Sequence, residues 1–313
     1  MSSSKIERLI EAARLYYEEN MTQQAVAARL GVSRPMVSVL LREARTTGIV
    51  TITINRAASQ TPLIARRLES LFSIKKAIVV PALNNHSQTD AAVTAAAYRF
   101  CFDGDTQPEN TGVGWGHMMG QLADYAEGTK KKTLRGQPTI FPLIGSIGAS
   151  YRGYRTNEIV ALLAAQTGMK AEFLHMPAFF ESEEELNAFA ATKACGDIFR
   201  RWDAMDRAVI SVSNCAAYPD LGVEYRFGAR LTQNACTGRV LAHYFDADGR
   251  IIAAKVDNVL QPSIERLRNV PEVTAVCSSL LQPVCMLGAL RLNVIDTLIL
   301  PAPLAVKTLE LVG

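Results

Sequence analysis

Residues suited to reading DNA are grouped near the N-terminus of the chain. Arg34, Met36, Ser38 and Arg42, with Arg45 as a further candidate, are left exposed on a predicted helix whose apolar residues pack inward. When such a helix binds DNA, its first turns meet base edges in the major groove, and an arginine further along pairs with a phosphate. The spacing therefore predicts binding of double-stranded DNA, with Arg42 on a phosphate.

A helix-turn-helix motif over residues 23–40 would position these side chains. Thr22 is expected to cap its first helix, and Gly31 to end that helix in a left-handed turn. Ser33 is expected to cap the second helix, and Pro35 suits its first turn, where an amide hydrogen would be unpaired anyway. The predicted contacts between the helices are Val26, Ala27, Leu30, Val32, Val37 and Leu40. The predicted DNA-binding residues are Thr22, Gln23, Ser33, Arg34, Pro35, Met36, Ser38 and Arg42. A three-helix bundle without a nucleic acid partner is the alternative interpretation.

Length and composition indicate two globular domains. The chain has 313 residues, of which 49% are hydrophobic and 20% charged, and single cores usually stop growing at about 250–300 residues. We predict a winged helix-turn-helix domain over residues 1–54, a polar linker over 55–62 that ends on a proline, and an α/β domain over 63–313. The first domain is expected to begin with a helix over 6–17 and to end with a β-branched wing strand over 49–54.

The positive charge is confined to the predicted DNA-binding part. Residues 1–60 hold eight Lys or Arg and five Asp or Glu, and the remaining residues hold 25 of each. The net charge of +3 thus belongs to the first 60 residues, as expected of a segment that meets phosphate.

The cysteines indicate a reducing compartment. All six are scattered, with no Cys-x-x-Cys pair and no neighbouring His tract, so neither a disulfide framework nor a zinc site is predicted. We expect buried thiols, no metal, no cofactor and no catalytic residues. The N-terminus lacks the apolar core of a signal peptide, and no apolar run approaches the roughly 18 residues of a membrane span. The prediction is a cytoplasmic protein without a membrane partner.

Short apolar runs alternate with helical patterns through residues 63–313. The predicted strands cover residues 77–80, 139–144, 208–212, 273–277 and 294–300. This alternation is typical of a largely parallel sheet with helices on both faces, which places the larger domain in the α/β class.

Short stretches along nearly the whole chain are similar to one family of bacterial regulators. They are Ala12–Tyr17, Met21–Gln23, Leu30–Pro35, Gly112–Gly116, Pro142–Gly148 and Tyr244–Gly249. On these residues the chain resembles the SorC/DeoR-type family of sugar-binding transcription regulators. The resemblance implies control of a carbohydrate catabolic operon by DNA binding. It also implies a Rossmann-like C-terminal domain, similar to phosphosugar isomerases, that binds a sugar, sugar phosphate or polyol and holds dimers or tetramers together. Whether the protein represses or activates depends on the position of its operator.

Two glycine-rich turns, at residues 112–116 and 145–148, are predicted to hold this effector. Each follows a β-like run, and backbone N–H groups in such turns, together with helix N-termini, can approach an anion. Guided by the resemblance, we predict the effector-binding residues Gly114, Trp115, Gly116, Gly145, Ser146, Ile147, Gly148, Arg155, Asn157, Thr237, Gly238, Arg239 and Gln282. His117 suits either a ligand contact or a helix cap, and His175 a place at the pocket. The stretch Asp246–Gly249 is predicted to form a structural hairpin turn.

The chain departs from the family where ligand contacts are usual. Gly145–Ser146 replaces Gly-Gly, Thr237–Arg239 replaces Val-Gly-Asp, and Ser278–Gln282 replaces Gly-Gly-x-x-Lys. The usual effector therefore cannot be assumed. Arg239 has two possible placements: in the pocket, where a guanidinium favours a planar anion over neutral hydroxyls, or on the surface.

Two alternatives to a ligand-sensing regulator remain open. A phosphosugar isomerase or deaminase would need a general base beside the glycine turns, and no Asp, Glu or Lys lies within residues 112–118 or 144–149. We therefore predict that the protein is not an enzyme. The second alternative is a regulator whose C-terminal domain is a ligand-free oligomerisation scaffold.

Overall fold

The computed structural model describes residues 3–19, 21–50, 60–104, 107–134, 136–147, 152–215 and 223–313. Contacts divide the chain into two compact units, Met1–Arg56 and Ala57–Gly313. None of the helices in these described ranges has both the length and the apolar character needed to cross a bilayer.

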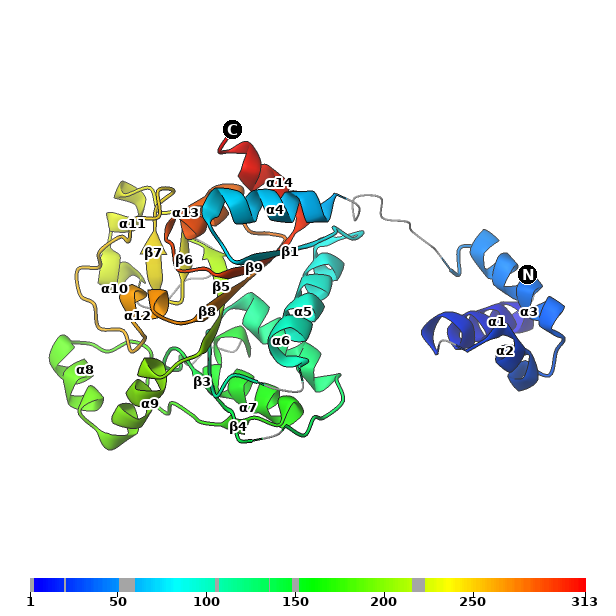
Figure 1. The fold of residues 1–313 in the computed structure, drawn as a ribbon, viewed down its shortest axis with the longest axis horizontal. Coiled ribbons are helices and arrows are strands. Elements are labelled where there is room, and N and C mark those ends of the chain that lie inside the picture. The colour runs from blue at the N-terminus through cyan, green and yellow to red at the C-terminus, as the bar shows by residue number, and fades with distance from the viewer. Residues whose placement is uncertain are drawn as a thin grey trace. The chain divides into compact units, whose positions relative to one another are not determined.

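Three α-helices and one π-helical turn occur among the described residues of the first unit (Figure 1). They are α1 (Ser3–Ala13), η1 (Arg14–Glu18), α2 (Gln23–Leu30) and α3 (Arg34–Thr46). The hydroxyl of Thr22 accepts a hydrogen bond from the Ala25 amide at 3.2 Å, and that of Ser33 accepts one from the Met36 amide at 3.4 Å. Gly31 ends α2 with a φ of 65°. These features confirm the predicted helix-turn-helix.

Apolar residues from the three helices form the core of the first unit. The fully buried set is Leu9, Ala12, Ala13, Leu15, Val26, Ala27, Val37, Leu40, Leu41 and Ala44. Leu30 and Val32, which flank the turn, pack against this core but are only half-buried. The predicted helix–helix contacts therefore hold, with a more open packing at the turn than expected.

The predicted wing and linker lie largely outside the described residues. Ile49 and Val50, the described start of the wing, form a bend rather than a strand and pack half-buried against the core of the unit. Helix α4 (Thr61–Phe72) already begins within the predicted linker. Pro62 lies in the first turn of this helix, where its missing amide hydrogen breaks no helical bond, so this proline starts a helix instead of ending a linker.

A mixed sheet organises the second unit (Figure 1). Its strands in the described residues are β1 (Lys76–Val80), β2 (Asn110–Val113), β3 (Thr139–Pro142), β4 (Lys170–Ala171), β5 (Arg207–Asn214), β6 (Gly238–Val240), β7 (His243–Phe245), β8 (Glu272–Cys277) and β9 (Thr297–Pro301). The order β1-β9-β8-β5-β2-β3-β4 is parallel throughout, and β6 and β7 extend from β5 as antiparallel strands. The predicted apolar runs overlap β1, β3, β5, β8 and β9, so the predicted parallel α/β sheet is confirmed.

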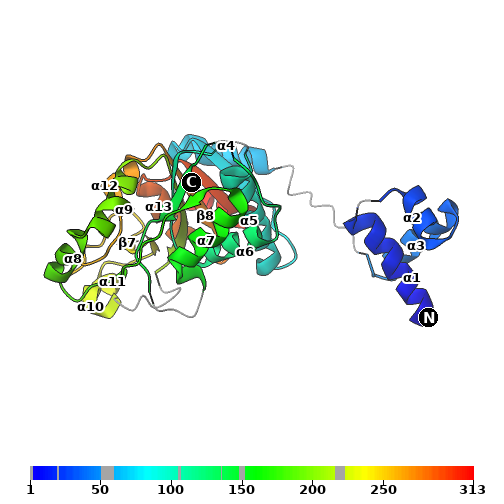
Figure 2. The same cartoon turned by 90° about the horizontal axis from the view of Figure 1, so that it is seen from below.

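Helices cover both faces of this sheet. Besides α4 they are α5 (His86–Phe102), α6 (His117–Glu127), η3 (Arg152–Tyr154), α7 (Thr156–Thr167), α8 (Glu183–Ala190), α9 (Lys193–Asp203), α10 (Val223–Phe227), α11 (Arg230–Gln233), α12 (Ile264–Arg268), α13 (Pro283–Arg291) and α14 (Ala302–Glu310). Along β5, Val209 packs into the core with α5, α6 and α7, whereas Ala208 and Ile210 pack into the core with α4, α13 and α14. Two apolar faces on one strand are what a doubly covered parallel sheet requires. Helices α8–α12 gather at one end of the unit and α5 and α6 at the other (Figure 2).

The predicted hairpin turn lies between β7 and the bridge that follows it. Asp246 Oδ1 accepts hydrogen bonds from the amides of Asp248 and Arg250, both at 2.9 Å, and the Gly249 amide donates to the Asp246 carbonyl at 3.1 Å. The side chain of Asp246 thus takes the place of a backbone acceptor, as expected for this turn type.

Replacing Gly31 by alanine should destabilise the first unit by about 1–2 kcal/mol, because a Cβ strains a left-handed residue even in open space. Apart from its chain neighbours, no atom lies within 4 Å of the position that a Cβ would take there. The expected destabilisation therefore comes from strain in the backbone alone. Asparagine tolerates this conformation better, and Gly31→Asn should cost less.

Urea unfolding measured in two ways tests this expectation. Both tryptophans, Trp115 and Trp202, belong to the second unit, so their fluorescence follows that unit, whereas helical circular dichroism follows both. We expect the helical dichroism of Gly31→Ala to fall at a lower urea concentration than that of the parent. The fluorescence transition should stay at the same urea concentration. Equal costs for the alanine and asparagine variants would contradict the backbone explanation.

Candidate ligand cavity and nucleic-acid interface

Three parallel strands end side by side at one edge of the sheet. The register pairs Val113 of β2 with Val209 of β5, and Val212 of β5 with Cys277 of β8. The segments that follow β2 and β8 therefore lie on either side of the end of β5. In open α/β sheets, ligands bind outside the carboxyl ends of the strands.

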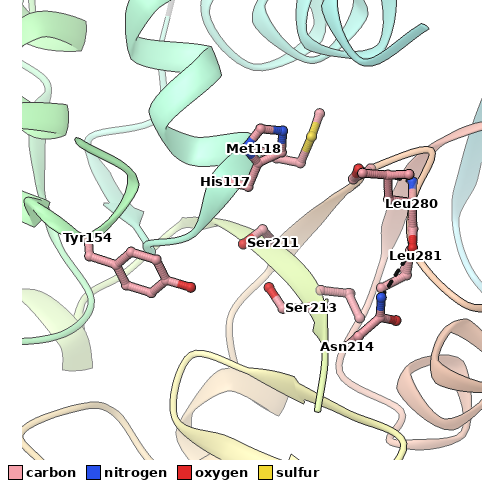
Figure 3. Close-up of a pocket in the computed structure, with 10 residues that line it drawn as sticks. His117, Met118, Tyr154, Ser211, Ser213, Asn214, Leu280 and Leu281 are labelled. Carbon is pink, nitrogen blue, oxygen red and sulfur yellow. Dashed lines mark hydrogen bonds between the residues drawn. The ribbon is translucent and has the colours of Figure 1, made fainter. Parts of the chain in front are cut away.

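A cavity of about 240 Å³ opens at this edge (Figure 3). Its lining consists of His117, Met118, Tyr154, Ser211, Val212, Ser213, Asn214, Ser278, Leu280 and Leu281. The volume is below the roughly 300–1,000 Å³ of pockets for drug-sized molecules, so the cavity suits a small ligand. In Figure 3, Tyr154 and the hydroxyls of Ser211 and Ser213 lie on one side, and Leu280 and Leu281 lie opposite.

Gly116 sets the distance between the turn after β2 and strand β5. Its φ of 115° suits glycine alone, and a Cβ at this position would clash with the hydroxyl of Ser211. Ser211 in turn donates a hydrogen bond to the Trp115 carbonyl at 2.7 Å. Because the turn packs directly on β5, helix α6 begins at the cavity with His117, and no side chain caps that helix.

Four backbone amides of the two predicted anion-binding turns donate to carbonyls within the protein. The donor–acceptor pairs are Gly114 to Val209 at 2.8 Å, Gly116 to Gly153 at 2.6 Å, Gly145 to Leu260 at 3.1 Å and Ser146 to Met176 at 2.8 Å. These four N–H groups hold the turns against neighbouring segments, whereas the sequence predicted that such groups face a ligand. Gly148 lies outside the described residues.

None of the described residues that we predicted for the effector lines the cavity. Asn157 clamps the backbone of Leu174: its Nδ2 donates to the carbonyl at 3.0 Å, and its Oδ1 accepts from the amide at 2.9 Å. Arg155 is exposed and pairs with Glu158 at 3.1 Å. His175 is also exposed. These side chains bond within the protein or face solvent, and their assignment as ligand contacts stays a prediction.

The remaining predicted residues lie behind the lining. Trp115 is buried, with its ring 5.2 Å from that of Tyr154, and the Gln282 amide donates to Asn214 Oδ1 at 2.9 Å. The others are used in packing: Ile147 against the core, Gly238 against Cys285, Ser146 through its hydroxyl 3.3 Å from that of Thr156, and Thr237 through its hydroxyl 3.4 Å from the Phe245 carbonyl. They support the cavity from outside.

Arg239 fits neither of the two placements that the sequence left open. It is 2% exposed, so it is not a surface residue, yet it is absent from the lining of the cavity. Its Nη2 donates to the Tyr154 hydroxyl at 2.7 Å, and its guanidinium carbon lies 5.7–5.9 Å from the rings of Trp115, Tyr154 and Tyr244. Arg239 therefore acts on the cavity through Tyr154, held by aromatic rings that favour a cation.

Asp90 of α5 places a carboxylate beside the first glycine turn, where the sequence pattern indicated none. Its side chain is 3% exposed and lies 3.7 Å from His117 Nε2. Ser278 donates to it through its hydroxyl at 2.7 Å, and Ser279 through its amide at 2.6 Å. Burial by itself raises the pKa of Asp90, but hydrogen bonds from His117, Ser279 and Ser278 outweigh burial and hold the pKa below its usual value. The carboxylate is thus ionised at neutral pH.

The sequence predicted buried cysteines, but two of the six are partly exposed. Cys101, Cys195, Cys277 and Cys285 are buried, whereas Cys215 and Cys236, beside the end of β5, are half-exposed. A hydrogen bond from Cys236 lowers the pKa of the Cys215 thiol; burial opposes this, and the positive charge of Arg239 adds to it. Within the described ranges, no three His, Cys, Asp or Glu side chains are grouped as metal ligands would be.

The first unit presents the predicted DNA-reading side chains to solvent. Arg34, Met36, Ser38, Arg42 and Arg45 of α3 are all exposed, as are Thr22, Ser33 and Pro35, and Gln23 is half-buried. Glu43, the carboxylate on α3, is paired with Lys5 of α1. The exposed face of α3 therefore carries a positive charge.

Comparison with known proteins assigns both units. Residues 57–309 match the model of a family described as a putative sugar-binding domain, and residues 11–47 match that of sigma-70, region 4. The chain is 23% identical to the sorbitol operon regulator of Klebsiella pneumoniae over 274 residues, which cover 85% of this chain and 86% of that protein. It is 26% identical to the deoxyribonucleoside regulator of Bacillus subtilis (strain 168) over 280 residues, 86% of each.

The crystal structure of the full-length sorbitol operon regulator from Klebsiella pneumoniae shares this fold. It superposes with a TM-score of 0.76 at 23% identity, over 97% of this chain and 98% of that one.

Cys215 should be the first thiol alkylated by iodoacetamide at neutral pH, because the thiolate is the reactive form. Burial raises the pKa of Cys101 to about 12 and also raises that of Cys277, so both should react far more slowly. Mass spectrometry of peptides after short exposures gives the order. Cys236→Ala should slow the reaction of Cys215 because it removes the thiol that donates the hydrogen bond; an unchanged rate would contradict the assigned hydrogen bond.

Asp90→Asn should lower the free energy of unfolding at neutral pH by about 1–3 kcal/mol, because it weakens hydrogen bonds to a buried charge. The folded pKa of Asp90 lies below the unfolded value of 3.8, so the stabilisation is present above that value and is lost as the pH falls through the folded pKa. Urea unfolding followed by tryptophan fluorescence should show that the free energies of unfolding of the variant and the parent converge as the pH falls into the acid range. A difference that widens in acid would contradict the direction of this shift.

Proposed function

Because the chain belongs to the family of putative sugar-binding domains, we propose that it regulates transcription of a carbohydrate catabolic operon under the control of a small effector. The N-terminal unit would bind operator DNA, and the effector would bind in the cavity of the C-terminal unit. The observation that carries the proposal is the pairing, in one chain, of an exposed basic recognition helix with a small cavity at the carboxyl edge of a parallel sheet. The relatives named as operon regulators support it.

On the DNA, the first turn of α3 would read bases. Arg34 and Met36 lie in that turn, where major-groove contacts are made, and Arg42 lies far enough along the helix to meet a phosphate. We infer that the protein acts as a homo-oligomer, a dimer or tetramer, with an operator of inverted half-sites that follows from the symmetry of a dimer. Effector binding would change how the C-terminal units pack and so alter the spacing of the DNA-binding units.

An enzyme of the isomerase or deaminase type is less well supported. Asp90 stands near the first glycine turn, but it is nearly fully buried, does not line the cavity, and accepts hydrogen bonds from Ser278 and Ser279. A general base must reach the proton that it abstracts. Asp90 is better placed to hold His117 and the turn after β8 in position.

A ligand-free scaffold would have no use for this cavity. This edge of the sheet combines serine hydroxyls, Tyr154 and His117 around a cavity. Polar groups that converge on an apolar cavity are the usual signature of a binding site. This favours a working sensor.

Gel shifts with the upstream DNA of the neighbouring operon, at several salt concentrations, test the DNA-binding half. Arg34→Ala should cost about 1–3 kcal/mol of binding and relax base preference, whereas Arg42→Ala should weaken binding to all sequences and reduce the salt slope by about one.

Arg200→Ala is the matched control, since this arginine of α9 is 73% exposed and belongs to the second unit. It should leave DNA binding unchanged. A loss of binding in Arg200→Ala equal to that in Arg34→Ala would count against α3 as the recognition helix.

A further inference from the structure

The cavity is lined by no lysine or arginine that could pair with an anion. Its ten described lining residues include no Lys, Arg, Asp or Glu. Its histidine, His117, already lies 3.7 Å from the Asp90 carboxylate. Proteins that bind phosphate supply such cations or several backbone N–H groups, because an unpaired anion removed from water is strongly disfavoured.

Much of the backbone around the cavity is already used. The amides of Gly114, Gly116, Gly145 and Ser146 donate to protein carbonyls. The N-terminus of α6 at His117 favours an anion, but its partial charge is only about half a unit. Asp90, whose carboxylate lies 3.7 Å from His117, places a full negative charge beside this helix end. The net field at the helix end therefore does not favour a phosphate.

The cavity does offer hydrogen bonds for hydroxyl groups. Ser211, Ser213 and Tyr154 bring hydroxyls to one side. A hydroxyl can both donate and accept, although Ser211 already donates to the Trp115 carbonyl and is left to accept. Because the Tyr154 oxygen accepts from the Arg239 guanidinium at 2.7 Å, its own O–H is polarised and becomes a stronger donor. Arg239 thus acts on the cavity through the neutral hydroxyl of Tyr154, and its own charge does not line the cavity.

The opposite side of the cavity is apolar. Leu280 and Leu281 line it there, and Met118 and Val212 add further apolar surface. A ring or chain of CH groups with hydroxyls along one edge matches such a two-sided cavity. The volume of about 240 Å³ limits the ligand to a few carbon atoms.

From these observations we infer that the effector is a neutral, unphosphorylated polyol or monosaccharide rather than a sugar phosphate. This rests on the proposed function, since it names the chemical class of the effector in the same cavity. Selectivity follows from charge: a phosphate group would lose its water without gaining a cation, and it would lie near the Asp90 carboxylate.

Isothermal titration of the full chain with matched pairs of ligands tests the inference. The pairs are erythritol with erythritol 4-phosphate, ribose with ribose 5-phosphate, and glucitol with glucitol 6-phosphate. In the pair that binds best, we expect the neutral member to bind at least about tenfold more tightly.

A charge-insertion variant sharpens the test. Leu280 lines the cavity and is 61% exposed, so Leu280→Lys should fold normally and shift the preference about tenfold or more toward the phosphorylated member. The control is Leu63→Lys on α4, outside the cavity lining and 67% exposed, which should leave the preference unchanged.

The outcomes separate this inference from the proposed function. Tighter binding of the phosphorylated member by the unaltered chain would overturn the inference and leave effector control standing. If no member of any pair binds, both the inference and effector control fail. A shift in Leu63→Lys equal to that in Leu280→Lys would overturn the assignment of the ligand to this cavity.

Discussion

The parallel pairing of β5 with β2 and β8 is the constraint on which the candidate site depends. Parallel strands end on the same edge, so the turn that follows β2, the end of β5 and the turn that follows β8 must meet there. Gly116 then decides how closely they meet, because only a residue without a Cβ fits over Ser211 at that φ. The start of α6, the serines of β5 and the leucines after β8 surround one cavity for this reason.

Features that rest on local contacts could be predicted from the sequence. The caps at Thr22 and Ser33 and the left-handed Gly31 involve residues three or four positions apart, and the structure has them where the pattern indicated. Five strands of the parallel sheet were also predictable, because strands covered on both faces are apolar runs. Strands β2 (Asn110–Val113) and β4 (Lys170–Ala171) were missed because they are short and partly polar. Pro62 was misassigned because a proline after a polar stretch suits a linker and a helix start equally well.

The composition of the cavity could not be predicted in the same way. Tyr154 reaches it from the short η3 turn, and Asp90 reaches its wall from α5, and no spacing in the sequence connects either residue to β5. A usable signal did exist in Ser211, Ser213 and Asn214, polar residues at the carboxyl end of an apolar strand. The prediction placed the ligand at the glycine turns instead. Glycines that permit close packing and glycines that admit a ligand look alike in a sequence.

Arg239 and Asp90 place two opposite charges next to the cavity. An arginine buried to this extent needs compensation, and it has the Tyr154 hydroxyl and three aromatic rings. Asp90 supplies the opposite charge on another wall, where hydrogen bonds from the β8 turn hold it ionised. Neither side chain lines the cavity. Between these two ions the described lining consists of hydroxyls, His117, Asn214 and apolar side chains, which is why a site flanked by two ions presents no Lys, Arg, Asp or Glu side chain.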